Sequence, residues 1–328
     1  MALYIKSVAH HTPEGRLTNA DLEKMVDTND EWIVSRTGIS ERAMAKEGEG
    51  AADLALPAAR EAMKKAGVEG KDLDAIVVAT CTPDTTIPGA SSHVQKAVGA
   101  GGSMAFDLNA ACSGFVYAME VCEGLLATGR HKTILLVCAE KFSSVVNYKD
   151  RNTCILFGDG AGALVLSSEP GGAKLCAAYS GGDGELIELL WRPGGGSKRP
   201  LHQGVEPGDE FLQMKGKEVF KHAVRGMATS AETTLERAGW SKEDLAWLIP
   251  HQANKRLIQA ASDRLKLDQE QVVVNIEKYG NMSAASIPVA MSEAQHKFKD
   301  GDKVVCLAFG AGFTWGGLAL EWETSSPS

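Results

Sequence analysis

Two stretches of the chain, 61–78 and 233–249, repeat the same order of features, and this repeat restricts the possible folds more than any other part of the sequence. In each stretch a helical pattern ends at Ala-Gly, an Asp-Leu pair follows, and a short apolar strand comes next. Helices that alternate with short buried strands are typical of an α/β fold with parallel-type sheets covered by helices. The repeat therefore predicts two similar α/β halves, residues 1–170 and 171–328, facing each other across a pseudo-twofold axis.

The correspondence continues into a turn, a helix and a strand, and it predicts that residues 109–139 match residues 275–308. In the first half, Cys112 follows a buried strand and precedes a long apolar helix that ends near Gly129. A helix N-terminus lowers the pKa of a cysteine and favours the thiolate, which is the nucleophilic form. Cys112 is therefore a candidate nucleophile. The alternative is a small buried hydrophobe, since free cysteines are among the most buried residue types.

Two polar residues of the second half are predicted to face Cys112. Asn281 lies in the counterpart of the cysteine turn, and His251 follows a strand at its carboxyl edge, where ligands gather in α/β sheets. Taken singly, His251 is better interpreted as a structural histidine and Asn281 as a helix cap, because asparagine is favoured there. The repeat brings all three residues to one cleft, and this convergence predicts a catalytic site.

Composition excludes several other classes of protein. With 328 residues, 44% hydrophobic and 23% charged, the chain is typical of a soluble globular protein, and no apolar run approaches the ~18 residues of a membrane span. The net charge of −8 argues against nucleic acid as a partner, and an acidic partner would need a local basic patch. Seven cysteines at irregular spacing fit neither a disulfide framework nor a zinc site, so free thiols and a cytoplasmic location are expected.

The sequence resembles the β-ketoacyl-acyl-carrier-protein synthase III family of the thiolase-like condensing enzymes, over essentially the whole chain. The motifs that carry the resemblance are Thr28-Asn-Asp-Glu-Trp32, Arg36-Thr-Gly-Ile39, Asn109-Ala-Ala-Cys-Ser-Gly-Phe115, Phe157-Gly-Asp-Gly-Ala161, His251-Gln-Ala-Asn254, Tyr279-Gly-Asn-Met-Ser283 and Phe309-Gly-Ala-Gly-Phe-Thr-Trp-Gly316. The resemblance implies a five-layered αβαβα fold built from two duplicated halves. It also implies an acyltransferase that condenses an acyl-CoA primer, expected to be acetyl-CoA, with malonyl-ACP (acyl carrier protein) and so initiates type II fatty-acid biosynthesis.

The resemblance further implies a catalytic triad of Cys112, His251 and Asn281. Cys112 would carry the acyl group, and His251 and Asn281 would hold the oxyanion that forms as malonyl-ACP loses carbon dioxide. The backbone N–H groups of Cys112 and Gly312 would form a second oxyanion hole. Neither a metal nor a cofactor is expected, because coenzyme A and the ACP phosphopantetheine enter as substrates.

Binding residues are implied in the same way. Trp32 and Arg151 would enclose the adenine of coenzyme A, with Arg36 at the phosphates and Asn254 on the pantetheine arm. Ile87 and Phe157 would bound the primer pocket, the former across the interface of a homodimer. The residues implied for ACP binding are Lys217, Lys221, Arg225, Lys255 and Arg256. The first three are spaced by four and so share a helix face, for which a solvated surface is the alternative interpretation. Asp263 departs from the basic residue of some relatives, which leaves the extent of the patch open.

Three rival interpretations remain at the level of sequence. A papain-like thiol hydrolase also uses Cys, His and Asn in this order, but its Cys-Gly-Ser-Cys-Trp signature is absent and the repeat would be unexplained. A polyketide-type condensing enzyme would share the same three residues. An inactivated paralogue is disfavoured by the intact triad and the intact glycine loop.

Overall fold

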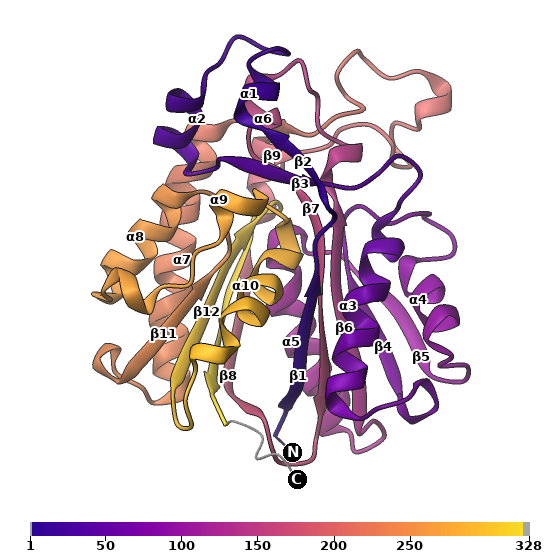
Figure 1. The fold of residues 1–328 in the computed structure, drawn as a ribbon, viewed down its shortest axis with the longest axis vertical. Helices are drawn as coiled ribbons and strands as arrows, with labels where there is room; N and C mark the ends of the chain where they lie inside the picture. The colour runs from indigo at the N-terminus through magenta and orange to yellow at the C-terminus, as the bar shows by residue number, and fades with distance from the viewer. Residues whose placement is uncertain (1, 324–328) are drawn as a thin grey trace.

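The computed structural model describes residues 2–323, and its centre is a nine-stranded sheet in the order β11-β12-β13-β8-β1-β7-β6-β4-β5 (Figure 1). The strands are β1 (Tyr4–His11), β4 (Ala75–Ala79), β5 (Met104–Leu108), β6 (Thr133–Lys141), β7 (Asp159–Ser167), β8 (Ala173–Gly182), β11 (Leu245–Pro250), β12 (Lys303–Gly310) and β13 (Thr314–Glu321). The two strands at the centre, β1 and β8, pair over only two residues of each strand, so the sheet has two parts joined by a narrow seam.

The two parts have the same topology. From the seam outward, β1-β7-β6-β4 in one part matches β8-β13-β12-β11 in the other. In both parts a parallel pair (β4 with β6, β11 with β12) adjoins an antiparallel pair (β6 with β7, β12 with β13). The counterpart of β5, which pairs in parallel with β4, is reduced to a single parallel bridge between Leu248 and Val272. The order of the strands thus follows the order of the sequence repeat.

Six helices cover the sheet, and their packing produces five layers (Figure 1). The helices are α3 (Ala51–Ala66), α4 (Ala90–Val98), α5 (Gly114–Ala127), α7 (Gly216–Ala238), α8 (Lys255–Leu265) and α10 (Ser286–Ala294). Helices α5 and α10 share one apolar cluster with both parts of the sheet, so they form the middle layer. Helices α3 and α4 pack on the outer face of the first part, and α7 and α8 on the outer face of the second. The expected αβαβα architecture is confirmed.

Strand β4 shows how the sequence produces these layers. All five residues are buried, as expected for a strand with helices on both faces. Ala75, Val77 and Ala79 belong to the inner cluster with α5 and α10, whereas Ile76 and Val78 belong to the outer cluster with α3 and α4. Side chains that alternate between faces therefore fill two different layers of the core.

The expectation of parallel-type sheets is only partly right. Within residues 2–323 the sheet is mixed, because β7 pairs antiparallel with β6 and β1, and β13 pairs antiparallel with β12 and β8. A short turn joins β12 to β13, whereas residues 142–158, which include α6, join β6 to β7. Short connections join antiparallel strands, whereas parallel strands need a crossover, here made by a helix. The sequence pattern of buried apolar strands does not distinguish the two arrangements.

The remaining short elements gather around the site described below, mostly at the upper end of Figure 1. Among them are β2 (Gly15–Thr18), β3 (Glu41–Met44), β9 (Leu190–Trp191), β10 (Gln213–Met214), α1 (Asn19–Leu22), α2 (Asp30–Thr37), α6 (Arg151–Cys154) and α9 (Ile276–Tyr279), with the 3₁₀ turns η2 (Ala111–Ser113) and η8 (Ser283–Ala285). In the part of the chain that the structure describes, no helix combines the length and apolarity that crossing a membrane requires. All seven cysteines are free thiols, as the sequence predicts.

Candidate active site

The nucleophile candidate lies in a strained turn between β5 and α5. Ala111 has a φ of +46°, which is uncommon for a residue with a side chain, and its backbone N–H donates to Asn109 Oδ1 at 3.2 Å. This turn places Cys112 one residue later, directly before the first turn of α5. The sequence prediction of a strand, a sharp turn and a helix around Cys112 is confirmed.

The second half contains the same turn with different side chains. Ser283 has a φ of +48°, and its backbone N–H donates to Asn281 Oδ1 at 2.8 Å; it is the first residue of η8, which leads into α10. Asn281 is therefore the structural counterpart of Asn109. The predicted alignment of residue 109 with residue 275 is wrong by six positions, because the residues before the turn, which include the short helix α9, have no equivalent of the same length in the first half.

His251 follows β11 directly and is held as a neutral imidazole. Its Nδ1 lies 2.6 Å from Ser286 Oγ, which also accepts the backbone N–H of Gln252 at 3.3 Å. The Ser286 hydroxyl can then donate its own proton to Nδ1, so the proton of the neutral imidazole lies on Nε2. Burial lowers the pKa of His251 to about 3. At neutral pH this side chain is thus a hydrogen-bond donor that carries no charge.

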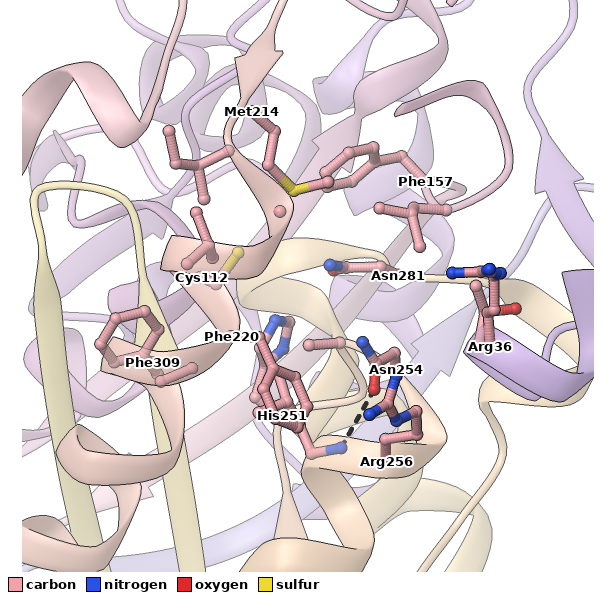
Figure 2. A pocket seen from close by; sticks show the side chains of 18 of the residues that line it. Arg36, Cys112, Phe157, Met214, Phe220, His251, Asn254, Arg256, Asn281 and Phe309 are labelled. Atoms are coloured by element: carbon pink, nitrogen blue, oxygen red, sulfur yellow. Dashed lines mark hydrogen bonds between the residues drawn. The ribbon is translucent and has the colours of Figure 1, made fainter. Parts of the chain in front are cut away.

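Cys112, His251 and Asn281 line one cavity of about 700 Å³, as Figure 2 shows. They come from three separate segments: the turn before α5, the end of β11 and the turn before α10. Because Asn281 Oδ1 already accepts a backbone N–H, its Nδ2 is the group left to donate into the cavity. The convergence expected from the repeat is present in the structure.

The protonation state of Cys112 differs from what its helix position suggests. Cys112 is only 7% exposed, and burial raises the pKa of its thiol to about 12, although contact with Ser283 acts in the opposite direction. Loss of solvation is the largest of the causes, and it favours the thiol form. Nucleophilic attack by Cys112 would therefore need a group that removes the proton.

The glycine loop after β12 meets Cys112 through residues other than the one predicted. A Cβ on Gly310 would lie 2.7 Å from the Cys112 backbone nitrogen, so these two segments are packed backbone to backbone. Gly310 lines the large cavity, and Ala311 lines a smaller one that Cys112 also borders. Gly312, which has a φ of +136°, lines neither of them. The structure thus brings residues 310 and 311, rather than 312, to the cavity walls.

The smaller cavity, about 230 Å³, also borders Cys112 and is mostly apolar. Phe157 borders both cavities and stacks on Phe142 with ring centroids 4.7 Å apart. Leu212 and Val145 also contribute to the wall. Ile87, the other predicted primer-pocket residue, lines neither cavity of this chain and is 89% exposed.

The residues expected to bind coenzyme A lie together at the cavity. The Trp32 ring has the guanidinium carbon of Arg36 at 4.5 Å and that of Arg151 at 5.0 Å from its centroid. Trp32, Arg36 and Asn254 line the cavity, whereas Arg151 contacts it only through Trp32 and donates to the Asp27 carbonyl at 2.8 Å. Asn254 Oδ1 caps α8 by accepting the Leu257 N–H at 3.0 Å. Its Nδ2 is left for another acceptor.

The five basic residues of the expected ACP patch are all exposed and lie on two helices. Lys217, Lys221 and Arg225 follow one face of α7, and Lys255 and Arg256 begin α8. Within residues 2–323, none of the five forms an ion pair with a carboxylate. Lys217 and Arg256 border the large cavity, so the patch continues into its lining.

Sequence reasoning missed a buried polar group beside the nucleophile. Glu140, at the end of β6, is fully buried and lies with Cys81 and Ser283 near the Cys112 thiol. Residues 81 and 140 both come just after buried apolar runs, where the carboxyl ends of parallel strands meet. The same position at a strand end that marks His251 therefore marks these two residues in the sequence.

The chain matches known proteins along almost its entire length. Residues 106–184 match the family model of 3-oxoacyl-[acyl-carrier-protein] synthase III, and residues 235–322 match its C-terminal model. A β-ketoacyl-[acyl-carrier-protein] synthase III from Caldanaerobacter subterraneus is 45% identical over 326 residues, covering 98% of each chain. The corresponding protein of Symbiobacterium thermophilum is 48% identical over 313 residues, 94% of this chain and 95% of the relative.

Solved structures agree with these matches. The 3-oxoacyl-[acyl-carrier-protein] synthase III of Aquifex aeolicus superposes with a TM-score of 0.90 at 42% identity, covering 98% of this chain and all of that one. The Pseudomonas aeruginosa protein of the same name gives 0.91 at 39% identity, with full coverage of both chains. A priming β-ketosynthase from the R1128 polyketide pathway gives 0.90 at 31% identity, over 99% of this chain and 97% of that one.

Proposed function

Because the chain belongs to the β-ketoacyl-[acyl-carrier-protein] synthase III family, we propose how its own residues carry out that family's condensation. The enzyme is an acyltransferase that joins an acyl-CoA primer to malonyl-ACP, with loss of carbon dioxide, and so initiates fatty-acid biosynthesis. The observation that carries the assignment of roles is the convergence of Cys112, His251 and Asn281 on one cavity.

In the first half-reaction, Cys112 Sγ attacks the acyl carbonyl of the CoA thioester, and CoA leaves as a thiolate. The oxyanion of the tetrahedral intermediate is held by the Cys112 backbone N–H and by an N–H of the adjoining loop at residues 310–312. The acyl chain then occupies the smaller apolar cavity beside Phe157. Acetyl-CoA is the expected primer.

In the second half-reaction, malonyl-ACP loses carbon dioxide, and its thioester carbonyl becomes an enolate oxygen. His251 Nε2–H and Asn281 Nδ2–H donate to that oxygen. A neutral imidazole suits this role, since its proton stays in place at any pH well above about 3. The carbanion attacks the acyl-Cys112 carbonyl and expels the cysteine sulfur. The scheme calls for neither a metal nor a cofactor.

Substrate recognition follows from the cavity rim. The adenine of coenzyme A enters between Trp32 and Arg151, and the Arg151 guanidinium, now 5.0 Å from the Trp32 ring centroid, moves away from the ring to make room for it. Arg36 meets the phosphates, and Asn254 Nδ2 donates to the pantetheine arm. The acidic carrier protein docks on the basic patch. Its members are Lys217, Lys221, Arg225, Lys255 and Arg256. Because none of them is already neutralised by an ion pair within residues 2–323, all five are available to such a partner.

We propose that the protein is a homodimer in the cytoplasm. Each subunit consists of two halves, residues 1–170 and 171–328. Ile87 is 89% exposed on the loop between β4 and α4, and Met104 at the start of the edge strand β5 is 39% exposed. Exposed apolar side chains next to a free sheet edge favour pairing with a second copy. In such a dimer Ile87 would reach the partner's primer cavity. Free thiols fit a reducing compartment.

Intact mass measured after incubation with acyl-CoAs of increasing length tests the nucleophile and ranks the primers. We expect one acyl adduct on the wild-type protein and none on Cys112→Ser. For His251→Ala and Asn281→Ala we expect loss of malonyl decarboxylation with acylation at least partly retained. Abolished acylation with intact decarboxylation in these two variants would refute their assigned role.

The structural match to a polyketide priming β-ketosynthase makes that activity the second candidate. Both activities would use the same acyl-Cys112, so they differ in the extender. Condensation of the acyl-enzyme with malonyl-ACP from fatty-acid synthesis supports the first assignment. Condensation only with a polyketide carrier protein supports the second.

A further inference from the structure

Glu140 is a carboxylate in the core that the mechanism above does not use. It is 0% exposed and accepts hydrogen bonds from Thr82 Oγ1 at 2.6 Å, from the Cys81 backbone N–H at 3.1 Å and from Thr80 Oγ1 at 3.3 Å. Within residues 2–323, no lysine, arginine or histidine forms an ion pair with it. A buried carboxylate without a cation is costly and therefore calls for a functional explanation.

The Ser283 hydroxyl is a neighbour of both this carboxylate and the proposed nucleophile. It interacts with the Cys112 thiol, the Cys81 thiol and the Glu140 carboxylate, but it makes a well-directed hydrogen bond with none of them. A buried hydroxyl without a settled partner is unusual, since nearly all such groups are satisfied. A hydroxyl that both accepts and donates can pass a proton from one neighbour to the other.

We propose that Ser283 and Glu140 form a proton relay that takes the proton of Cys112 during acylation and returns it after condensation. This inference rests on the proposed acyl-Cys112 intermediate. The relay supplies the base that a buried thiol needs. It also leaves the space for substrate free, because Glu140 and Ser283 line neither of the two cavities that Cys112 borders.

The proton and electron pairs balance in both half-reactions. During acylation, the Cys112 proton moves to Ser283 Oγ as the Ser283 proton moves to Glu140, while the new S–C bond forms. The C–S bond to CoA then breaks, and the CoA thiolate is protonated by water. During condensation the carbanion expels the Cys112 thiolate, which takes a proton from Ser283 as Glu140 returns the stored one.

His251 is a poorer base for this step. Its Nδ1 is engaged by Ser286, and burial lowers the pKa of His251 to about 3. By contrast, burial raises the pKa of the Glu140 carboxyl, which allows it to keep a proton during the lifetime of the acyl-enzyme. Burial also raises the pKa of Cys112 to about 12, so spontaneous ionisation is rare near neutral pH.

The test is a single-turnover acylation of the full-length enzyme with acetyl-CoA, followed by intact mass and, in weak buffer, by a pH indicator. We expect the wild type to take up about one proton from solution per acyl group, because CoA leaves protonated while Glu140 stores the cysteine proton. Ser283→Ala and Glu140→Gln should lose this uptake and acylate ~10²-fold more slowly. Their rates should keep rising with pH as the thiolate fraction grows, whereas the wild-type rate should level off.

Ser113→Ala is the matched control. Ser113 follows Cys112 in the same turn, and its hydroxyl is also buried without a partner, but no interaction connects it to the sulfur or to Glu140. This variant should acylate and take up protons like the wild type. Ser283→Ala removes a hydroxyl that makes no directed bond, so it should fold normally even if Glu140→Gln does not.

Three results would overturn the relay. These are wild-type acylation without proton uptake, a wild-type rate and pH profile in Ser283→Ala, and an equal loss of rate in Ser113→Ala. A wild-type protein that forms no acyl adduct at all would instead refute the proposed function, and the relay with it.

Discussion

Gly310, the last residue of β12, packs directly on the cysteine turn, and substituting it should slow acylation. A Cβ at this position would lie 2.7 Å from the Cys112 backbone nitrogen and 3.0 Å from the Cys112 Cβ. Ordinary van der Waals contact begins at 3.4 Å, so Gly310→Ala must displace either β12 or the turn by roughly half an ångström or more. Because this backbone nitrogen is also the proposed oxyanion donor, one displacement affects both the nucleophile and the donor.

The expected size of the effect follows from that displacement. A shift of about 1 Å in a catalytic group costs ~10²-fold in rate, so we expect acylation by Gly310→Ala to fall by about 10- to 100-fold. Overpacking should lower the free energy of unfolding by ~1–3 kcal/mol. The first quantity is measured by the single-turnover appearance of the acyl adduct in the mass spectrum, and the second by urea denaturation.

Gly124→Ala is the control, on the helix α5 that directly follows the cysteine turn. A Cβ at Gly124 has open space, since nothing lies within 4 Å of it. Alanine in the interior of α5 should therefore stabilise the protein by up to ~1 kcal/mol and leave acylation unchanged. If Gly310→Ala acylates at the wild-type rate, the close packing of the loop on Cys112 does not position the nucleophile.

Three further predictions concern pH and the two substrates. Burial lowers the pKa of His251 from 6.5 to about 3, so below pH 6.5 the unfolded chain binds a proton that the folded chain does not. Relative to His251→Gln, the wild type should therefore lose up to ~1.4 kcal/mol of unfolding free energy for each unit by which the pH falls between about pH 6 and 4. Urea denaturation measures this loss. Lys221→Ala and Arg225→Ala should each raise KM for malonyl-ACP several-fold, with no change for malonyl-CoA or in Lys71→Ala, which lies outside the patch; equal effects on both extenders would contradict carrier docking. Trp32→Ala should raise KM for acyl-CoA about tenfold by loss of stacking, while KM for malonyl-ACP stays unchanged.

The sequence predicts the fold well because each helix and strand of the repeat is a short contiguous segment with its own apolar pattern. The helix that ends at Ala66 and the strand of Ala75–Ala79 lie where the apolar pattern and Ala66-Gly67 place them. The direction of strand β7 could not be predicted in the same way. Buried apolar strands have the same pattern in parallel and antiparallel pairs, so the mixed sheet becomes visible only when the register is known.

The site residues could likewise be predicted from the sequence, whereas their environments could not. Cys112, His251 and Asn281 are each marked by a position in the repeat, and the structure brings them together. The environment of a group is a different kind of information. That the thiol pKa is raised rather than lowered depends on how completely Cys112 is desolvated, and Glu140 enters only because β4 and β6 are neighbours in the sheet. These are sums over distant contacts that no short motif encodes.

The two turns explain why only one half of the repeat carries the proposed nucleophile. Both have a residue at positive φ and an asparagine that accepts its N–H, so their backbones are nearly equivalent. The residue at the position of Cys112 in the second half is Ala284. Its side chain lines neither cavity and points at Gly114, where an added Cβ would lie 3.1 Å from that of Ala284. The turns pack on each other through small residues, and a sulfur at position 284 would press on α5 instead of facing a substrate. The division of labour between the halves, with sulfur on one side and Asn281 on the other, therefore follows from how closely the two helix starts must approach.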